Sequence, residues 1–188
     1  EERDRVLIID ALNMFLRSYT IIPSMNPQGL PNGGTIGFLK SIQKLCRDFR
    51  PKEIVVCWDG HGGSEKRRQL NKEYKKGRRP VRFNRRMIEL PDDVVKKNRS
   101  DQQLRLHEYL NNMPVIDYVE ADDVVSYVCQ HKKYNEYTKI IVSSDKDFFQ
   151  LCKDDTVVIW RPIQKEFINR GILVNKHKIH PNNYALAR

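Results

Sequence analysis

Seven carboxylates lie at or shortly after the ends of four mainly apolar runs of the chain, and this spacing is the strongest chemical signal in the sequence. Asp10 follows the run 6–9, and Asp59 follows the run 54–58. The other five are Glu120, Asp122 and Asp123 after the run 115–119, and Asp145 and Asp147 after the run 139–142 and two serines. Apolar runs without alternation are typical of strands buried on both faces of a parallel sheet.

Parallel strands bring their carboxyl ends to one edge of a sheet, where ligands of open α/β folds bind. Seven carboxylates at one edge repel each other unless a cation lies among them. Oxygen ligands in this number suit Mg²⁺ or Mn²⁺. Two such ions form the usual arrangement for phosphodiester hydrolysis, in which one activates the attacking water and the other stabilises the leaving oxygen. The spacing therefore predicts a metal-dependent phosphodiesterase site.

Each carboxylate by itself has a plainer interpretation. An aspartate at a strand-to-helix junction often only caps the helix or interacts with its dipole. For Asp122 and Asp145 taken singly, capping is the favoured interpretation. It is weaker for Asp10, which Ala-Leu-Asn follows, and for Asp59, which a glycine follows. One shared site explains all four junctions better than four separate caps.

Helical patterns alternate with these expected strands. Apolar residues on one face predict a helix over 35–49, which Arg50-Pro51 ends. Further helices are expected from about Asn84 into 101–110, over 122–131 and over 146–151, with a last strand over 156–160 and a helix begun at 177–188. This order predicts an α/β fold with a mainly parallel central sheet flanked by helices.

The positive charge of the chain is concentrated in one segment. The formal net charge is +10, and residues 62–100 hold fourteen basic and five acidic side chains, which is +9. The rest of the chain has a net charge close to zero, so the excess of positive charge belongs to this one basic segment. Such a segment favours contact with the phosphates of a polyanion. The alternative is a solvated loop.

The bulk properties exclude several other classes of protein. A chain of 188 residues fits one sizeable domain, and it contains no apolar run long enough for a membrane helix and no visible signal peptide. The four cysteines form no CxxC pair and are expected to be reduced, which predicts a cytoplasmic location. His177 and His180 lack further zinc ligands, and Gly33-Gly34 lacks the Lys-Ser/Thr of a phosphate loop.

Two motifs carry a resemblance to a known family. Val119-Glu-Ala-Asp-Asp123 is followed about twenty residues later by Ile141-Val-Ser-Ser-Asp-Lys-Asp-Phe148. This pair resembles the flap endonuclease / 5′–3′ exonuclease family, which has a PIN-like nuclease core, and within it most resembles the RNase H of tailed bacteriophages. Gln150-Leu151 and Trp160-Arg161-Pro162 also fit that subgroup. The resemblance extends from Asp10 to the end of the chain.

The resemblance implies two clusters of metal ligands. The first would comprise Asp10, Asp59, Glu120, Asp122 and Asp123, and the second Asp145 and Asp147. Two Mg²⁺ ions would bind there, with Mn²⁺ able to substitute.

The resemblance also implies a helical arch or clamp between the acidic motifs, through or beside which a 5′ single strand passes. Segment 62–100 resembles this arch. Within it Tyr74, Lys75 and Arg78 resemble residues that contact the scissile phosphate and nearby bases, and Arg17 resembles a basic residue near the active site. Lys75, Arg78 and Arg17 are thus the expected catalytic cations. The expected nucleic-acid contacts are Arg67, Arg68, Lys72, Tyr74, Lys75, Lys76, Arg78 and Arg79. The alternative for Tyr74 is a ring packed under its own arch.

The implied activity is that of a structure-selective 5′-nuclease that removes RNA primers or 5′ flaps during replication, most similar to a phage enzyme. Its expected partners are DNA and RNA–DNA hybrids with 5′ single-stranded ends, and replication proteins such as a single-strand-binding protein or polymerase. We expect a monomer with no membrane contact. The rival interpretations are a PIN-like single-strand ribonuclease and a non-catalytic scaffold that binds nucleic acid.

The chain departs from the family pattern at one end. The family continues into a helix-hairpin-helix element with a Gly-Asp-x-x-Asp-Asn run, and this sequence stops at Arg188 where that run would begin. The expected organisation is thus one 5′-nuclease catalytic domain over 1–188, with its helix-hairpin-helix element missing or only begun at 177–188. In that case the second metal cluster would lack some of its ligands.

Overall fold

The protein is described by a computed structural model, which covers residues 2–59, 84, 86–110, 120–176, 178 and 181. The chain divides into two compact units. We call one the sheet unit, which comprises Glu1–Asn13, Phe49–Asp59 and Val119–Arg188. We call the other the helical unit, which comprises Met14–Asp48 and Gly60–Tyr118.

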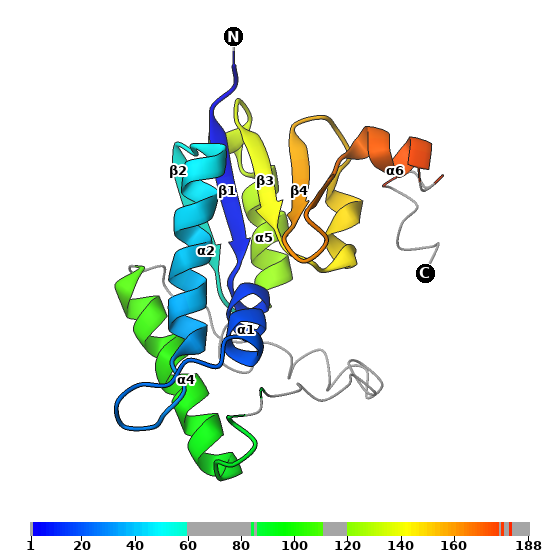
Figure 1. Cartoon of the computed structure of the whole chain (residues 1–188). Helices are drawn as coiled ribbons and strands as arrows, with labels where there is room; N and C mark the ends of the chain where they lie inside the picture. The colour runs from blue at the N-terminus through cyan, green and yellow to red at the C-terminus, as the bar shows by residue number, and fades with distance from the viewer. Residues whose placement is uncertain are drawn as a thin grey trace, which may run out of the picture. The chain divides into compact units, whose positions relative to one another are not determined.

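The sheet unit contains a five-stranded sheet in the order β2-β1-β3-β4-β5 (Figure 1). The strands are β1 (Arg5–Asp10), β2 (Glu53–Cys57), β3 (Thr138–Val142), β4 (Val157–Arg161) and β5 (Glu166–Ile168). The first four run parallel, and only β5 pairs antiparallel, with β4. The predicted mainly parallel α/β sheet is confirmed, whereas the short antiparallel edge strand was not expected.

One face of the sheet carries the apolar core of this unit. Helix α5 (Ala121–Gln130) packs against β1 and β2 (Figure 1). Val125 of α5 is fully buried, as are Val6 and Ile8 of β1 and Ile159 of β4. The 3₁₀ helices η1 (Lys132–Tyr134) and η2 (Lys146–Leu151) and the helix α6 (Arg170–Lys176) complete the unit. The helix predicted over 122–131 and the short helix over 146–151 are therefore confirmed.

Among the described residues, the helical unit holds most of α1 (Ala11–Ile21) and α2 (Gly33–Phe49), and all of α4 (Asp92–Tyr109). A Cβ at Gly34 would lie only 2.5 Å from the Phe15 ring, so a glycine at this position lets α1 and α2 approach closely. The helix predicted over 35–49 is confirmed as α2. Helix α1 was not expected, because the sequence after Asp10 gives only a weak start signal.

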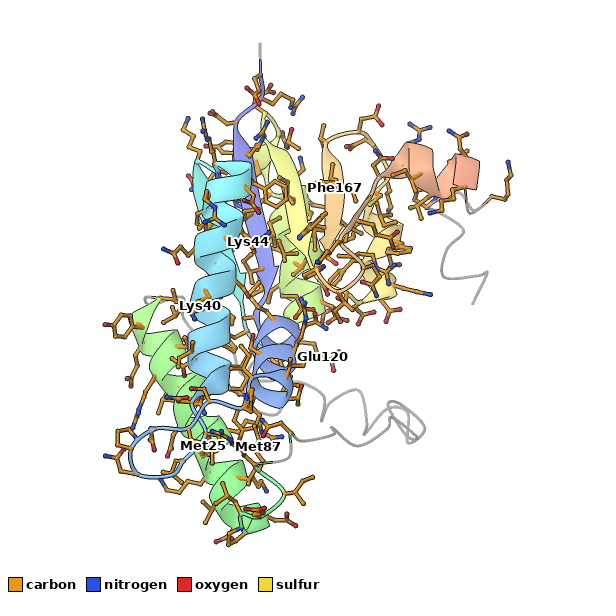
Figure 2. All side chains as sticks on the ribbon, viewed as in Figure 1. Met25, Lys40, Lys44, Met87, Glu120 and Phe167 are labelled. Carbon is orange, nitrogen blue, oxygen red and sulfur yellow. The ribbon has the colours of Figure 1, made fainter. Side chains whose placement is uncertain are left out.

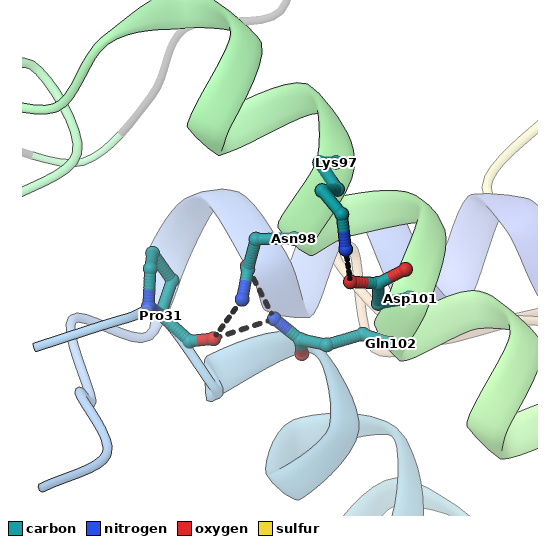
Figure 3. A network of polar contacts seen from close by, with 5 residues as sticks. All are labelled: Pro31, Lys97, Asn98, Asp101 and Gln102. Atoms are coloured by element: carbon teal, nitrogen blue, oxygen red, sulfur yellow. Dashed lines mark hydrogen bonds and ion pairs between the residues drawn. The ribbon is translucent and has the colours of Figure 1, made fainter. Parts of the chain in front are cut away.

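A buried amide joins α4 to the start of α2. Gln102 accepts hydrogen bonds from the backbone N and the hydroxyl of Thr35. Gln102 and Asn98 both donate to the carbonyl of Pro31 (Figure 3). Tyr19 donates from its hydroxyl to the carbonyl of Val95 at 3.1 Å. These contacts hold α4, which includes the last nine residues of the basic segment, in a packed position.

The structure corrects the helix expected from about Asn84. Residues 86–89 form a turn, and α4 begins at Asp92 after Pro91. Proline restrains the residue before it from helical geometry, and the two aspartates of the first turn favour a helix start at this point. Residues 92–100, predicted as part of the arch, thus belong to this packed helix. The strand expected over 115–119 and most of the tail 177–188 lie outside the described residues.

Two smaller expectations concern cysteines and membranes. All four cysteines are free thiols; Cys57 and Cys152 are buried, and Cys46 and Cys129 are partly buried. Burial raises the pKa of the Cys57 and Cys152 thiols to about 12. Among the helices of the described ranges, none is both long and apolar enough to cross a membrane.

Candidate active site

Asp10 lies at the carboxyl edge of the sheet, at the end of an interior strand. It is the last residue of β1, and β1 is flanked by β2 and β3. Its Oδ2 accepts a hydrogen bond from the hydroxyl of Ser143 at 2.8 Å, and its Oδ1 accepts one from the backbone N of Asn13 at 3.5 Å. Since α1 begins at the next residue, the bond from Asn13 is a helix-capping contact. This contact is long, and Asp10 also accepts the shorter bond from Ser143, so capping is only part of what this carboxylate does.

The electrostatic surroundings of Asp10 disfavour its charge. Burial raises the pKa of the Asp10 carboxyl from 3.8 to about 6, with further increases from the nearby carboxylates of Asp59 and Asp145. The hydrogen bonds from Ser143 and Asn13 lower the pKa and offset only part of that increase. A carboxylate that is desolvated and faces two like charges is a group whose ionised form a cation would stabilise.

Asp59 lies two residues beyond β2 and connects that strand to α5. Its Oδ1 accepts a hydrogen bond from the backbone N of Ala121 at 2.7 Å. The N–H of Ala121 is one of the first donors of α5, which have no partner within the helix. Asp59 therefore provides a hydrogen-bond acceptor for the N-terminal turn of α5, although the two are far apart in the sequence.

Glu120 occupies the N-cap position of α5 and is only 3 % exposed (Figure 2). Asp122 and Asp123 lie in the first turn of the same helix, where carboxylates interact favourably with the helix dipole. The Oδ1 of Asp122 accepts a hydrogen bond from the backbone N of Asp123 at 3.0 Å. These three carboxylates thus lie together at the start of α5.

Asp145 and Asp147 follow β3 in the same way. Asp145 caps η2, and its Oδ1 accepts a hydrogen bond from the backbone N of Asp147 at 2.9 Å. The capping interpretation favoured for Asp145 is confirmed. Capping leaves one oxygen of a carboxylate available, so it does not exclude a second role in metal binding.

The structure thus places the described carboxylates beside the carboxyl ends of three neighbouring parallel strands. Within the described ranges, no three acidic, histidine or cysteine side chains come close enough together to form a complete metal site. Asp10, Asp59, Asp122 and Asp145 each direct one oxygen to a backbone N–H. The assignment of all seven as metal ligands stays a prediction.

The expected cationic residues are placed only in part. The basic residues and Tyr74 of 67–79 lie outside the described residues. Arg17 is a half-buried residue of α1 in the helical unit. Two polar residues that sequence reasoning did not single out, Ser143 and Asn13, contact Asp10 directly. Their only signal in the sequence is their position, Asn13 three residues after Asp10 and Ser143 two residues before Asp145.

Comparisons with known proteins agree with this architecture. A family model described as 5′-3′ exonuclease, N-terminal resolvase-like domain, matches residues 5–180. A flap endonuclease Xni of Shewanella baltica is 33 % identical over 177 residues, covering 92 % of this chain and 60 % of the relative. A 5′-3′ exonuclease of Aquifex aeolicus is 27 % identical over 177 residues, covering 93 % of this chain and 56 % of the relative. The chain spans about three fifths of the length of these curated relatives.

A solved structure shows the same fold. The T5 D15 protein co-crystallised with metal ions matches with a TM-score of 0.70 at 17 % identity, covering 96 % of this chain and 64 % of that one. At this identity the likeness concerns the fold alone, and it confirms the predicted PIN-like arrangement. With nearly the whole sequence matched by the family model, the chain belongs to the 5′–3′ exonuclease family, as the two acidic motifs predicted.

Proposed function

We propose that this chain is the catalytic core of a structure-selective 5′-nuclease that hydrolyses phosphodiester bonds with divalent metal ions. The observation that carries the proposal is the position of Asp10. It ends an interior strand that has a parallel neighbour on each side, its charge is disfavoured by burial, and Asp59 and Asp145 repel it. Membership of the 5′–3′ exonuclease family supports the same activity.

The donor set fits hard divalent cations. The residues that would hold them are Asp10, Asp59, Glu120, Asp122 and Asp123 in one cluster and Asp145 and Asp147 in the other. All offer carboxylate oxygens, which Mg²⁺ prefers and Mn²⁺ accepts. When bound, two such ions would supply an activated water and stabilise the leaving oxygen. The chain itself would hold four of these carboxylates in place through the backbone bonds described above, those of Asp10, Asp59, Asp122 and Asp145.

The proposed substrate is DNA or an RNA–DNA hybrid with a 5′ single-stranded end or flap. Segment 62–100, of charge +9, would bind its phosphates, and Lys75 and Arg78 would stabilise negative charge that develops on the scissile phosphate. Tyr74 would stack against a base. A solved structure of bacteriophage T5 D15 flap endonuclease is described as a pseudo-enzyme-product complex with DNA and metal ions, which supports this class of substrate.

The biological setting follows from this substrate class. Removal of RNA primers or 5′ flaps in DNA replication would place the protein in the cytoplasm, acting as a monomer beside a single-strand-binding protein or a polymerase. Junction selectivity would depend on contacts to the duplex, and the body outside the basic segment has a net charge near +1. We therefore expect tighter binding to single-stranded 5′ ends than to duplex DNA.

A cleavage assay tests the proposal. Three 5′-labelled substrates, a DNA flap, an RNA-primed duplex and a single-stranded RNA, are incubated with Mg²⁺, with Mn²⁺ and with EDTA. We expect metal-dependent cutting of the flap and of the primed duplex. Cutting of the single-stranded RNA alone would favour a PIN-like ribonuclease, and binding without cleavage would favour a non-catalytic scaffold.

A further inference from the structure

Ser143 lies beside Asp10 because of the register of the sheet. In the parallel pair of β1 and β3, Ile9 is opposite Val142, so the next residues along the two strands are Asp10 and Ser143. Ser143 is only 1 % exposed. Its hydroxyl donates to Asp10 Oδ2 at 2.8 Å and accepts a hydrogen bond from the backbone N of Asp145 at 3.0 Å. One buried hydroxyl therefore connects a carboxylate of the first cluster to the backbone of the second.

Asn13 makes a second connection between the same two places. Its backbone N donates to Asp10 Oδ1 at 3.5 Å, and its side-chain Oδ1 accepts a hydrogen bond from the backbone N of Ser144 at 3.3 Å. Together, Ser143 and Asn13 form hydrogen bonds with both oxygens of Asp10 and with two successive backbone N–H groups of the loop after β3. The carboxylate is thereby held against rotation, and the loop that carries Asp145 is held against the end of β1.

We propose that Ser143 and Asn13 are positioning residues that fix the orientation of the Asp10 carboxylate and the separation of Asp10 from Asp145. The proposal rests on the proposed metal-dependent function. Neither side chain is a ligand in this role. Groups that hydrogen-bond a ligating carboxylate set its orientation, and their loss typically weakens metal binding even though the ligands remain.

The central experiment measures Mn²⁺ binding by isothermal titration calorimetry, without nucleic acid. Ser143→Ala should weaken binding by about tenfold to a hundredfold, as is usual for loss of such a partner. Ser143→Thr keeps the hydroxyl and should retain most of the affinity. Asn13→Ala removes only the side-chain bond to the backbone N of Ser144, at 3.3 Å, and keeps the bond from its own backbone N to Asp10, so it should weaken binding by a smaller factor.

Ser126→Ala is the matched control. Ser126 is a partly buried serine of α5, and its hydroxyl donates to the carbonyl of Asp122 at 2.9 Å rather than to a carboxylate. The Ser126→Ala variant therefore loses a hydroxyl near the acidic residues, while the hydrogen bonds of the carboxylates do not change. We expect this variant to bind Mn²⁺ as the unmodified protein does. Thermal unfolding of each variant in EDTA separates loss of metal affinity from loss of folding.

The proposal is overturned if Ser143→Ala binds Mn²⁺ no more weakly than Ser126→Ala. If Ser143→Ala does not fold, Asn13→Ala decides, and unchanged binding by that variant overturns the proposal. The proposed function is judged separately. Tight Mn²⁺ binding that Ser143→Ala weakens, with no cleavage of any 5′ end by the unmodified protein, would refute the nuclease while keeping the positioning role. Absence of Mn²⁺ binding by the unmodified protein would refute both.

Discussion

Asp59 and Ala121 are 62 positions apart in sequence, and the carboxylate of the first accepts a hydrogen bond of 2.7 Å from the backbone N of the second. This bond joins the end of β2 to the first turn of α5. The same carboxylate is a proposed metal ligand, so Asp59 combines a structural role with a chemical one. The two roles can be separated by substitution.

Asp59→Asn and Asp59→Ala should differ in stability and agree in activity. The amide oxygen of asparagine can still accept from Ala121, whereas alanine leaves that donor without its partner, at a cost of about 1 kcal/mol. Both variants lose the negative charge, so both should lose most metal-dependent cleavage. Urea unfolding in EDTA and a flap assay with Mg²⁺ measure the two effects. Near-normal cleavage by Asp59→Asn would remove Asp59 from the proposed ligands.

The raised pKa of Asp10 predicts a pH-dependent stability in the absence of metal. The folded protein holds this proton up to a pH of about 6, whereas the unfolded chain releases it near 3.8. The stabilisation that protonated Asp10 contributes to the folded state is therefore fully present below pH 3.8 and is lost as the pH rises through 6. The shift corresponds to about 3 kcal/mol.

Asp10→Asn should remove this dependence. Relative to the unmodified protein, its free energy of unfolding in EDTA should increase between pH 4 and pH 7 by up to about 3 kcal/mol. Chemical denaturation at several pH values measures the difference. A difference in the free energy of unfolding between the two proteins that stays constant over this range would contradict the raised pKa of Asp10.

Metal affinity should show the opposite trend with pH. Protonated Asp10 cannot act as a ligand, so Mn²⁺ binding should weaken as pH falls below 6, by up to about tenfold for each pH unit. Calorimetric titrations at pH 5, 6 and 7 in one buffer would show this. Affinity that is the same at all three values would mean that Asp10 does not ligate the ion.

The basic segment should dominate the salt dependence of binding. Replacing Lys72, Lys75 and Lys76 together by glutamine should reduce the slope of log K against log salt by roughly two to three, because each phosphate contact releases about one counterion. In the control, the exposed Lys40, Lys153 and Lys176 are replaced by glutamine, which changes the net charge by the same amount. Fluorescence anisotropy with a single-stranded oligonucleotide measures both slopes. Equal slopes in the two triple variants would mean that the three arch lysines do not bind phosphates.

Lys75→Ala should slow the chemical step more than it weakens binding. A cation placed where negative charge develops stabilises the transition state above all, and its loss should cost on the order of a hundredfold in single-turnover rate. Lys66→Ala, in the same segment but outside the expected contacts, is the control. A loss of affinity at an unchanged rate would contradict the catalytic role of Lys75.

The fold was largely predictable because the strands carry strong local signals. Runs such as 6–9 and 140–142 have no polar residue to place on a solvent face, so burial on both sides and parallel pairing follow from the sequence. The start of α4 was misplaced because the basic residues before Pro91 favour a helix by propensity, while the proline moves its start to Asp92. Strand β5 has only three residues, too few for a clear period of two.

The sequence by itself determined which carboxylates come to one edge of the sheet. Asp10, Asp59 and Asp145 each lie at or just after the end of an apolar strand, and parallel strands end on the same side whatever their order. Only the tertiary structure decided how Asp10 is held. The register that places Ser143 beside Asp10, and the turn that lets Asn13 reach the N–H of Ser144, depend on pairing between segments more than 130 positions apart. No local pattern encodes such a pairing, because register is set by the packing of whole strands against their neighbours.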